Sequence, residues 1–326
     1  MTNNYPTYNF MHAPVHHRRL ALIDMGTNTF HLLIVEDRPG QSPHILVRTK
    51  VGVRLGEGGI SHGEIAPAPY ARALQTLRGF KEEIELHQAT EVRATATSAM
   101  RVSRNGPELV RDILDQTGIQ VEVIGGEREA ELIAKGIRQA VALGQEKHLL
   151  MDIGGGSVEF IIANADTIFW KQSFEIGAQR LLDKFFTEPS GVFPRESLRA
   201  QIAYLAEVLT PLTAAVAAHK PLAGLVGSSG SFDTLADLTV GRVRKEAELP
   251  PSTWLSVSNF EHHFAQLLTL NHDERVALPG MFPMRADMLV VASVIVEYVL
   301  KTYGLTRITT SAFALKEGLL AELLGK

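Results

Sequence analysis

The sequence predicts an α/β protein that contains a duplicated β-hairpin. Predicted strands alternate with predicted helices along the 326 residues, which is typical of α/β layers and not of an all-β sandwich. A strand–Asp–x–Gly–strand pattern occurs over residues 21–35, ALIDMGTNTFHLLIV, and again over residues 149–163, LLMDIGGGSVEFIIA. At a constant offset of 128 residues, Asp152 aligns with Asp24, Gly154 with Gly26, and Ser157 with Thr29.

Each hairpin is a candidate phosphate-binding loop. Gly154, Gly155 and Gly156 carry no side chains at the tip, so backbone N–H groups are left bare and can wrap an anion. Asp152 enters this turn and Glu159 leaves it, and hard carboxylate oxygens suit Mg²⁺. A plain glycine-tipped hairpin would explain this stretch alone, but the second copy favours a phosphate loop in each half.

The composition is that of an ordinary globular protein of two domains. It is 45% hydrophobic and 21% charged, with a net charge of −4 and no dense Lys/Arg run, so we expect no nucleic-acid surface. The absence of cysteine excludes a disulfide scaffold, a thiolate zinc site and a cysteine nucleophile. The polar N-terminus and the shortness of the longest apolar run, residues 288–296, predict neither signal peptide nor membrane contact, with a cytoplasmic location as the default.

The first half is predicted to run hairpin, strand, helix, strand, helix, strand, helix after a loose tail. Pro67 suits the first turn of a helix whose apolar residues Ala71, Leu74, Leu77, Phe80 and Ile84 recur at helical spacing. Asn105, Pro107 and Gly118 are start and stop signals for the next helix, with a stripe of Leu109, Ile113 and Leu114. The predicted elements are the tail 1–19, the hairpin 20–36, strands 44–53, 91–97 and 119–124, and helices 67–87, 105–118 and 127–142.

The second half repeats this order loosely. The predicted elements are the second hairpin, strands 167–174, 222–226 and 306–309, and helices 177–186, 195–217, 232–238, 285–301 and 312–324. The helix over residues 285–301 is apolar almost all round, which predicts burial on most sides. Residues around Pro250 and Pro251 are predicted to form a polar loop.

Glu129 is the candidate general base. In the predicted helix, Ala130, Ile133 and Ile137 form the buried side, and Glu129 lies at its margin in the first turn. A carboxylate there either complements the helix dipole or acts as a positioned base, and the residue types leave both options open. The preceding Gly125-Gly126 supports function because it lets a ligand approach the helix N-terminus.

Three further groups of residues could contact phosphate. Thr95, Thr97, Ser98 and Arg101 follow a strand, where hydroxyls and a guanidinium suit phosphate, although helix capping is the plainer interpretation. The turn of Gly227, Ser228, Ser229, Gly230 and Ser231 could be only a tight turn, but it is the third glycine–hydroxyl turn after an apolar strand. Arg285 and Asp287 fit capping and function equally, and His31, His262 and His263 are assigned structural or surface roles.

Seven segments in order resemble a known family: DMGTNTFHLLI, TATSAMR, IGGEREAEL, MDIGGGSVEF, GSSGS, PMRADM and SAFALKEGLL. They look like the exopolyphosphatase / guanosine pentaphosphate phosphohydrolase (Ppx/GppA) phosphatases, which belong to the superfamily of actin, sugar kinases and heat-shock ATPases. The resemblance runs from Leu20 to Leu324. It implies two actin-like (ribonuclease H-like) domains with a central cleft: domain I over residues 20–144, domain II over 145–311, and a terminal helix over 312–326 crossing back to domain I.

The resemblance also implies Mg²⁺-dependent hydrolysis of a terminal phosphoanhydride and assigns site residues. The catalytic residues are Glu129 and a phosphate-facing Arg101, and the metal-associated acids are Asp152 and Glu159. The resemblance places the two phosphate loops on residues 24–29 and 152–157. With the candidates found above from residue chemistry, the predicted phosphate-binding residues are Asp24, Gly26, Thr27, Asn28, Thr29, Thr97, Ser98, Gly154, Gly155, Gly156, Ser157, Gly227, Ser228, Ser229, Gly230, Ser231 and Arg285. Two departures stand out: Lys316 replaces a frequent Arg and so lacks the bidentate fork, and the chain ends where longer relatives continue into HD-type helical domains.

The expected function is release of terminal orthophosphate from inorganic polyphosphate. The alternative is removal of the 5′ γ-phosphate of guanosine pentaphosphate (pppGpp). A sugar- or acetate-kinase-like ATP phosphotransferase and a non-catalytic actin-like binding module rank behind these. The expected partners are therefore polyphosphate or a phosphorylated guanine nucleotide, with a homodimer suggested by base rate alone.

Overall fold

The fold is built on two mixed β-sheets. The computed structural model describes residues 18–38, 40–186, 188, 191–245 and 248–325. The first sheet has the order β3-β2-β1-β4-β5. Its strands are β1 (Arg18–Met25), β2 (Phe30–Asp37), β3 (His44–Val51), β4 (Glu91–Ala96) and β5 (Val121–Val123).

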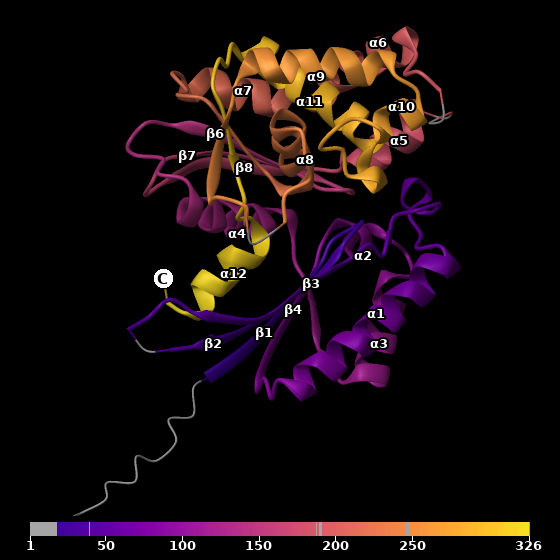
Figure 1. The fold of residues 1–326 in the computed structure, drawn as a ribbon, viewed down its shortest axis with the longest axis vertical. Helices are drawn as coiled ribbons and strands as arrows, with labels where there is room; N and C mark the ends of the chain where they lie inside the picture. Colours follow the sequence, from indigo (N-terminus) through magenta and orange to yellow (C-terminus); the bar gives the residue numbers. More distant parts are fainter. Residues whose placement is uncertain (1–17, 39, 187, 189–190, 246–247, 326) are drawn as a thin grey trace, which may run out of the picture.

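The second sheet repeats the core of the first and adds one strand. Its order is β10-β11-β9-β6-β7-β8, with β6 (His148–Ile153), β7 (Val158–Ala163), β8 (Ile168–Phe174), β9 (Leu225–Ser228), β10 (Ser252–Leu255) and β11 (Ile308–Ser311). In both sheets the first hairpin strand pairs antiparallel with its partner and parallel with a later strand. The duplicated hairpin predicted from the sequence is therefore confirmed (Figure 1).

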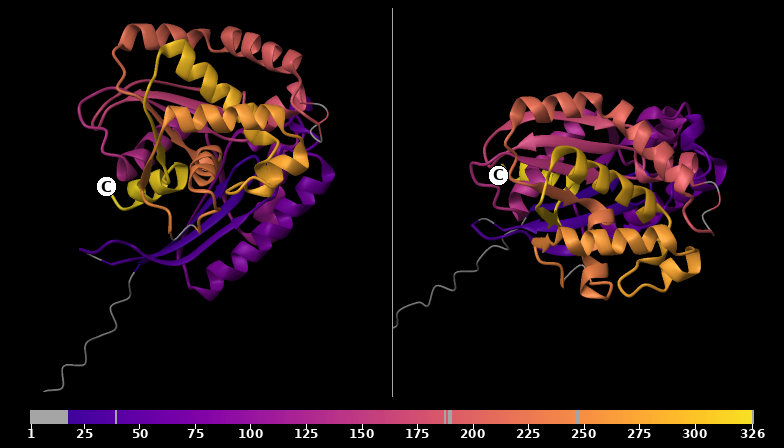
Figure 2. Two further views of the ribbon diagram at one scale, coloured as in Figure 1. Left: turned by 45° about the horizontal axis from the view of Figure 1, so that its top comes forward. Right: turned by 90° about the horizontal axis from the view of Figure 1, so that it is seen from above.

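The outer helices cover the far face of each sheet. Helices α1 (Pro67–Leu86), α2 (Ser98–Val102) and α3 (Gly106–Thr117) pack on the first sheet in one apolar core. A larger core joins the second sheet to its own helices, with α6 and α7 along its outer side (Figure 2). The helices that belong to the second sheet are α5 (Ala178–Phe185), α6 (Arg195–Val208), α7 (Thr210–His219), α8 (Ser229–Val240), α9 (Val257–Thr269), α10 (His272–Val276) and α11 (Met288–Tyr303).

A third core lies between the two sheets. Helices α4 (Gly126–Ala140) and α12 (Leu315–Leu323) fill this layer (Figure 1). The layer buries Leu20 and Leu22 of β1 together with Leu150 of β6 and Ile161 of β7. The C-terminal helix thus packs against α4 and β1, while the domain boundary at residue 144 stays a prediction.

Several predicted boundaries were wrong for identifiable reasons. Residues 1–17 of the predicted tail lie outside the described residues, but Arg18 and Arg19 already belong to β1. The single helix predicted over 195–217 ends at Val208, and a second begins at Thr210 with Pro211 in its first turn, because proline cannot continue a helix. The loop around Pro250 leads into β10 and α9, which the sequence reasoning missed.

The predicted apolar stripes were correct in part. Leu77, Phe80 and Ile84 of α1 are buried, but Ala71 is exposed and Ala73 takes its place in the core. In α3, Leu109 and Ile113 are buried, whereas Leu114 is 43% exposed. Arg285 lies in a short 3₁₀ helix, η3 (Pro283–Arg285), and the buried helix α11 begins only at Met288.

In the described part of the chain, no single helix is long and apolar enough to cross a bilayer. Helices α6 and α7 reach that length and composition only as a pair, which is bent by 62°.

Candidate active site

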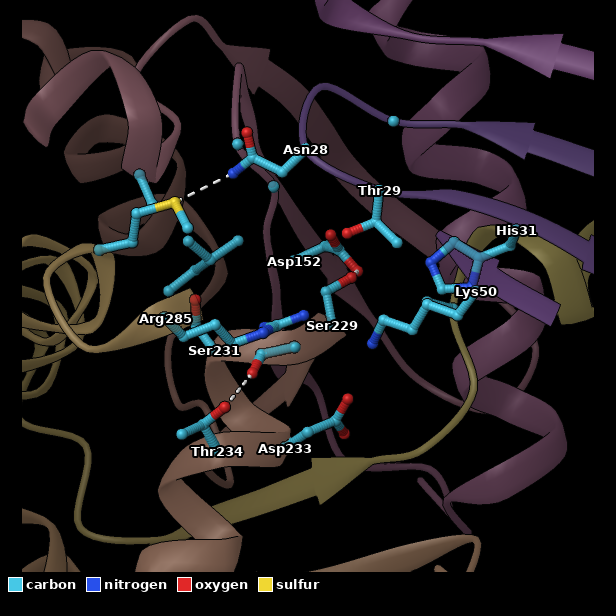
Figure 3. Close-up of a pocket in the computed structure, with 18 of the residues that line it drawn as sticks. Asn28, Thr29, His31, Lys50, Asp152, Ser229, Ser231, Asp233, Thr234 and Arg285 are labelled. Atoms are coloured by element: carbon cyan, nitrogen blue, oxygen red, sulfur yellow. Dashed lines mark hydrogen bonds between the residues drawn. The ribbon is translucent and has the colours of Figure 1, made fainter. Parts of the chain in front are cut away.

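The two hairpin tips meet at a cavity of about 390 Å³ between the two sheets (Figure 3). Each tip closes with the same backbone bond: Gly26 N–H donates to Thr29 O at 3.1 Å, and Gly154 N–H donates to Ser157 O at 3.0 Å. The tips also touch, because a Cβ added to Gly155 would lie 2.6 Å from Nδ2 of Asn28. A larger residue at position 155 would therefore have to displace the Asn28 side chain, so glycine favours the close approach of the two loops.

Most predicted site residues line this cavity. Those that do are Asp24, Gly26, Thr27, Asn28, Thr29, Thr97, Glu129, Asp152, Gly154, Gly155, Ser229, Gly230, Ser231 and Arg285. Those outside the lining are Ser98, Arg101, Gly156, Ser157, Glu159, Gly227 and Ser228. Most of the predicted segments therefore meet at one cavity, several of their residues lie outside its wall, and the roles of all of them stay predictions.

Asp152 is the penultimate residue of β6 and is held by the glycine–serine turn of residues 227–231. Its Oδ2 accepts hydrogen bonds from Ser228 Oγ and Ser229 Oγ, each at 2.6 Å. Ser229 adopts a left-handed backbone with φ of +69°, a conformation that costs a non-glycine residue about 1 kcal/mol or more. The bond to Asp152 offsets that strain, and it places the first residue of α8 beside the carboxylate.

Two turn glycines of this region make room for larger side chains. Gly230 lies directly against the guanidinium of Arg285, and a Cβ there would collide with it. Gly227 lies against the ring of Phe232 in the same way. A larger residue at position 230 would therefore displace the Arg285 guanidinium, so the glycine–serine turn sets the position of Arg285 as well as forming part of the cavity wall.

Four acidic side chains crowd the centre of the molecule. The pKa of Asp24 is raised to about 7, mainly by burial; Lys316 opposes this rise and Asp152 adds to it. Burial also raises the pKa of Asp152, against the hydrogen bonds from Ser228 and Ser229. The pKa of Glu159 is raised well above its usual value by burial and by Glu129 and Asp152. So much buried negative charge calls for a cation or for protonation.

Glu129 lies in the first turn of α4 with its side chain at the cavity. It is 7% exposed, and its Oε2 accepts a hydrogen bond from Arg101 Nη1 at 2.8 Å. Burial raises its pKa to about 7, although the Arg101 guanidinium lowers it. The preceding Gly126 packs against Ser173 of β8, where a Cβ would collide, so α4 starts close to the second hairpin sheet.

Arg101 lies outside the lining of the cavity, and its expected contact with a phosphate stays a prediction. Its guanidinium lies behind Glu129, with Nη1 also donating to Ile124 O at 3.1 Å and Nη2 donating to Glu175 Oε1 at 2.9 Å. Ser98 likewise turns away from the cavity, since its Oγ donates to Glu175 Oε2 at 2.5 Å. The carboxylates of Glu129 and Glu175 therefore hold the Arg101 guanidinium. No sequence pattern indicated a role for Glu175.

Four basic side chains also line the cavity, of which the sequence analysis named Arg285 and Lys316 and missed Lys50 and Arg54. Lys50, Arg54, Arg285 and Lys316 line it together with Asp233. His31, which was assigned a structural role, also lines the cavity, and burial followed by Lys316 and Lys50 lowers its pKa well below the usual value. Strand register could have found Lys50, because it pairs with His31, which pairs with Asp24.

The acidic side chains suit a hard divalent cation. Among residues 18–325, within the described ranges, no three His, Asp or Glu side chains gather as a complete protein metal site. Mg²⁺ is usually held by one or two carboxylates together with substrate phosphates and water. Asp24 and Asp152 both line the cavity with raised pKa values, so their donor chemistry fits Mg²⁺, whereas Glu159 is only 1% exposed and accepts from Ser173 Oγ.

Known proteins resemble this chain along most of its length. Residues 33–326 match the Ppx/GppA phosphatase family. Exopolyphosphatase 1 of Mycobacterium bovis is 27% identical over 308 residues, covering 93% of this chain and 87% of the relative. The crystal structure of an exopolyphosphatase from Cytophaga hutchinsonii has 44% identity and a TM-score of 0.88, covering 94% of this chain and 98% of that chain.

A more distant structure shows the same fold. The PPX-GPPA enzyme of Aquifex aeolicus has 22% identity and a TM-score of 0.77, and covers 94% of this chain and 99% of that chain. The family match and the similar structures agree with the two-sheet architecture and with a phosphatase, which is a hydrolase. This chain belongs to the Ppx/GppA phosphatase family.

Proposed function

We propose that this phosphatase releases terminal orthophosphate from inorganic polyphosphate. The observation that carries the proposal is the meeting of two anion-binding hairpin tips and the Glu129 carboxylate at one cavity. The names of the relatives from Mycobacterium bovis and Cytophaga hutchinsonii support polyphosphate as the substrate class. Basic side chains across the cavity, including Lys50 and Arg285, complement an anionic chain.

Glu129 serves as the general base in this proposal. A carboxylate with a pKa of about 7 can accept a proton from water near neutral pH. Because Oε2 is held by Arg101, we assign Oε1 to the attacking water. The water oxygen bonds to the terminal phosphorus, Glu129 takes the proton, and the bond to the bridging oxygen of the shortened chain breaks.

Binding and charge neutralisation do most of the catalytic work in such a reaction. The backbone N–H groups of the hairpin tips bind the phosphate oxygens, and Arg101 orients Glu129. We further propose that Asp152 and Asp24 hold Mg²⁺, with Glu159 adding negative charge from the layer behind. Bound Mg²⁺ would neutralise the phosphate charge that develops in the transition state.

The test is phosphate release measured against substrate length, with Mg²⁺ present and after chelation. We expect orthophosphate release from polyphosphate that stops on chelation and returns with added Mg²⁺. The same assay with guanosine pentaphosphate tests the alternative 5′-phosphohydrolase, and release from the nucleotide alone would replace the proposal. ATP turnover that requires an added sugar or acetate acceptor would instead indicate a kinase-like phosphotransferase.

A further inference from the structure

Glu175 links the catalytic pair to the second half of the molecule. It lies between β8 and α5, whereas Ser98 and Arg101 lie on α2 and Glu129 begins α4. Its Oε1 accepts from Arg101 Nη2 at 2.9 Å, and its Oε2 accepts from Ser98 Oγ at 2.5 Å and from Arg180 Nη2 at 3.1 Å. One carboxylate thus joins three side chains from both halves.

These contacts fix the guanidinium of Arg101 at both ends. Nη1 is bound to Glu129 and to Ile124 O, while Nη2 is bound to Glu175. Because a guanidinium is planar with a rigid fork of donors, anchoring Nη2 sets the direction in which Nη1 meets Glu129. The position of the Glu129 carboxylate therefore depends on Glu175 through Arg101.

Glu175 is itself held by a well-anchored neighbour. Arg180 on α5 donates from Nε to Gly156 O at 2.9 Å and from Nη1 to Ile60 O at 3.2 Å. Gly156 belongs to the second hairpin tip, so a continuous set of polar contacts runs from that phosphate loop to Glu129. Such a network can transmit position because each member has a fixed partner.

Glu175 does not line the central cavity but a second hollow of about 360 Å³. Ser61, Arg180, Asp183 and Lys184 line that hollow with it. A change at Glu175 therefore acts on the reaction without removing a contact to substrate in the central cavity. We propose that Glu175 is a positioning residue of the hydrolysis that holds Arg101 against Glu129, an inference that rests on the proposed role of Glu129 as the base.

A kinetic double-mutant cycle on Arg101 and Glu175 tests this inference. We expect E175A to lower kcat about 10-fold or more with KM nearly unchanged, because small misplacements of a reacting group are costly. In the R101A background, E175A should cause no further loss, since both changes remove the same link. E175Q should recover most of the kcat lost in E175A, because the amide oxygen still accepts from Arg101.

Asp183→Asn is the matched control. Asp183 lines the same hollow and accepts from Ser61 Oγ at 3.0 Å across the halves, but it makes no contact with Arg101 among the described hydrogen bonds and ion pairs, so kcat should not change. Independent, additive losses from R101A and E175A, or an effect of E175A on KM alone, would overturn the inference. If E175A does not fold, E175D replaces it in the cycle, because the shorter side chain draws the carboxylate away from Arg101. The same non-additivity with R101A is then expected, and additive losses would again overturn the inference. Undiminished turnover in E129Q would defeat the proposed base, whatever the cycle shows.

Discussion

Glu129 carries two opposing influences at the scale of a single residue. Burial in the cavity wall favours the neutral acid, while the hydrogen bond from Arg101 at 2.8 Å favours the carboxylate. Burial is the larger effect, and the pKa rises to about 7. In the proposed mechanism, a base with a pKa near the working pH is basic enough to take a proton while remaining partly ionised. A carboxylate that only complements a helix dipole would not need such a pKa.

Substituting Glu129 by Gln should abolish most of the turnover and preserve the fold. Loss of a general base lowers kcat by roughly 10²–10⁴-fold, and the amide can still accept a hydrogen bond from Arg101. Steady-state phosphate release measures the loss of turnover, and the thermal midpoint Tm shows whether the fold is preserved. Glu127→Gln is the control, since that residue is exposed on the same first turn. Equal turnover in E129Q and E127Q would remove Glu129 from the mechanism.

At the scale of elements, the crossing of α4 and α12 depends on two glycines. A Cβ at Gly136 of α4 would collide with Ala314 O, and a Cβ at Gly318 of α12 would collide with Leu132 O. Both obstacles are backbone atoms, which cannot turn aside as a side chain can. The C-terminal helix therefore lies in backbone contact with the helix that positions Glu129.

Alanine at either crossing glycine should destabilise the protein. Overpacking of this kind costs about 1–3 kcal/mol, so G136A and G318A should each lower Tm in a thermal unfolding experiment. Gly79 of α1 is the control, because a Cβ there meets no atom within 4 Å and alanine is the better helix former by about 1 kcal/mol. A Tm of G318A equal to that of G79A would show that the two helices do not pack so closely.

The sequence predicted these elements better than their contacts. The 128-residue offset located both hairpins and Asp152, since turn chemistry and strand patterns are local. No sequence pattern indicated Gly318 or Glu175, because the partners that they contact are distant in the chain. Gly318 packs against the backbone of Leu132, and Glu175 binds Arg101. Arg101 was identified from the sequence, but only the fold shows the two carboxylates that hold its guanidinium. The loop next to Pro250 was predicted only as a polar connection, but its residue Leu249 lines the cavity.

At the scale of the whole molecule, the site lies where the two halves share one apolar core. Leu20 and Leu22 of the first sheet and Leu150 and Ile161 of the second pack into the same layer around α4 and α12. The hairpin tips end beside this layer, so their carboxylates are buried by both halves at once. Folding therefore brings Asp24, Glu129, Asp152 and Glu159 into one space. There the charge of Asp152 helps to raise the pKa values of the other three acids, in addition to the larger effect of burial.

This crowding should make stability depend on pH and on Mg²⁺. Asp24 and Glu129 have pKa values of about 7 when folded, against about 4 in an unfolded chain. Between about pH 4 and 7 the folded state binds more protons than the unfolded state, so the free energy of unfolding decreases as pH rises through that window.

With metal chelated, Tm should be higher at pH 5.5 than at pH 8. Added Mg²⁺ should raise Tm more at pH 8, where the carboxylates are ionised, and D24N should reduce this difference. Equal Mg²⁺ stabilisation at both pH values would contradict a metal site at these acids.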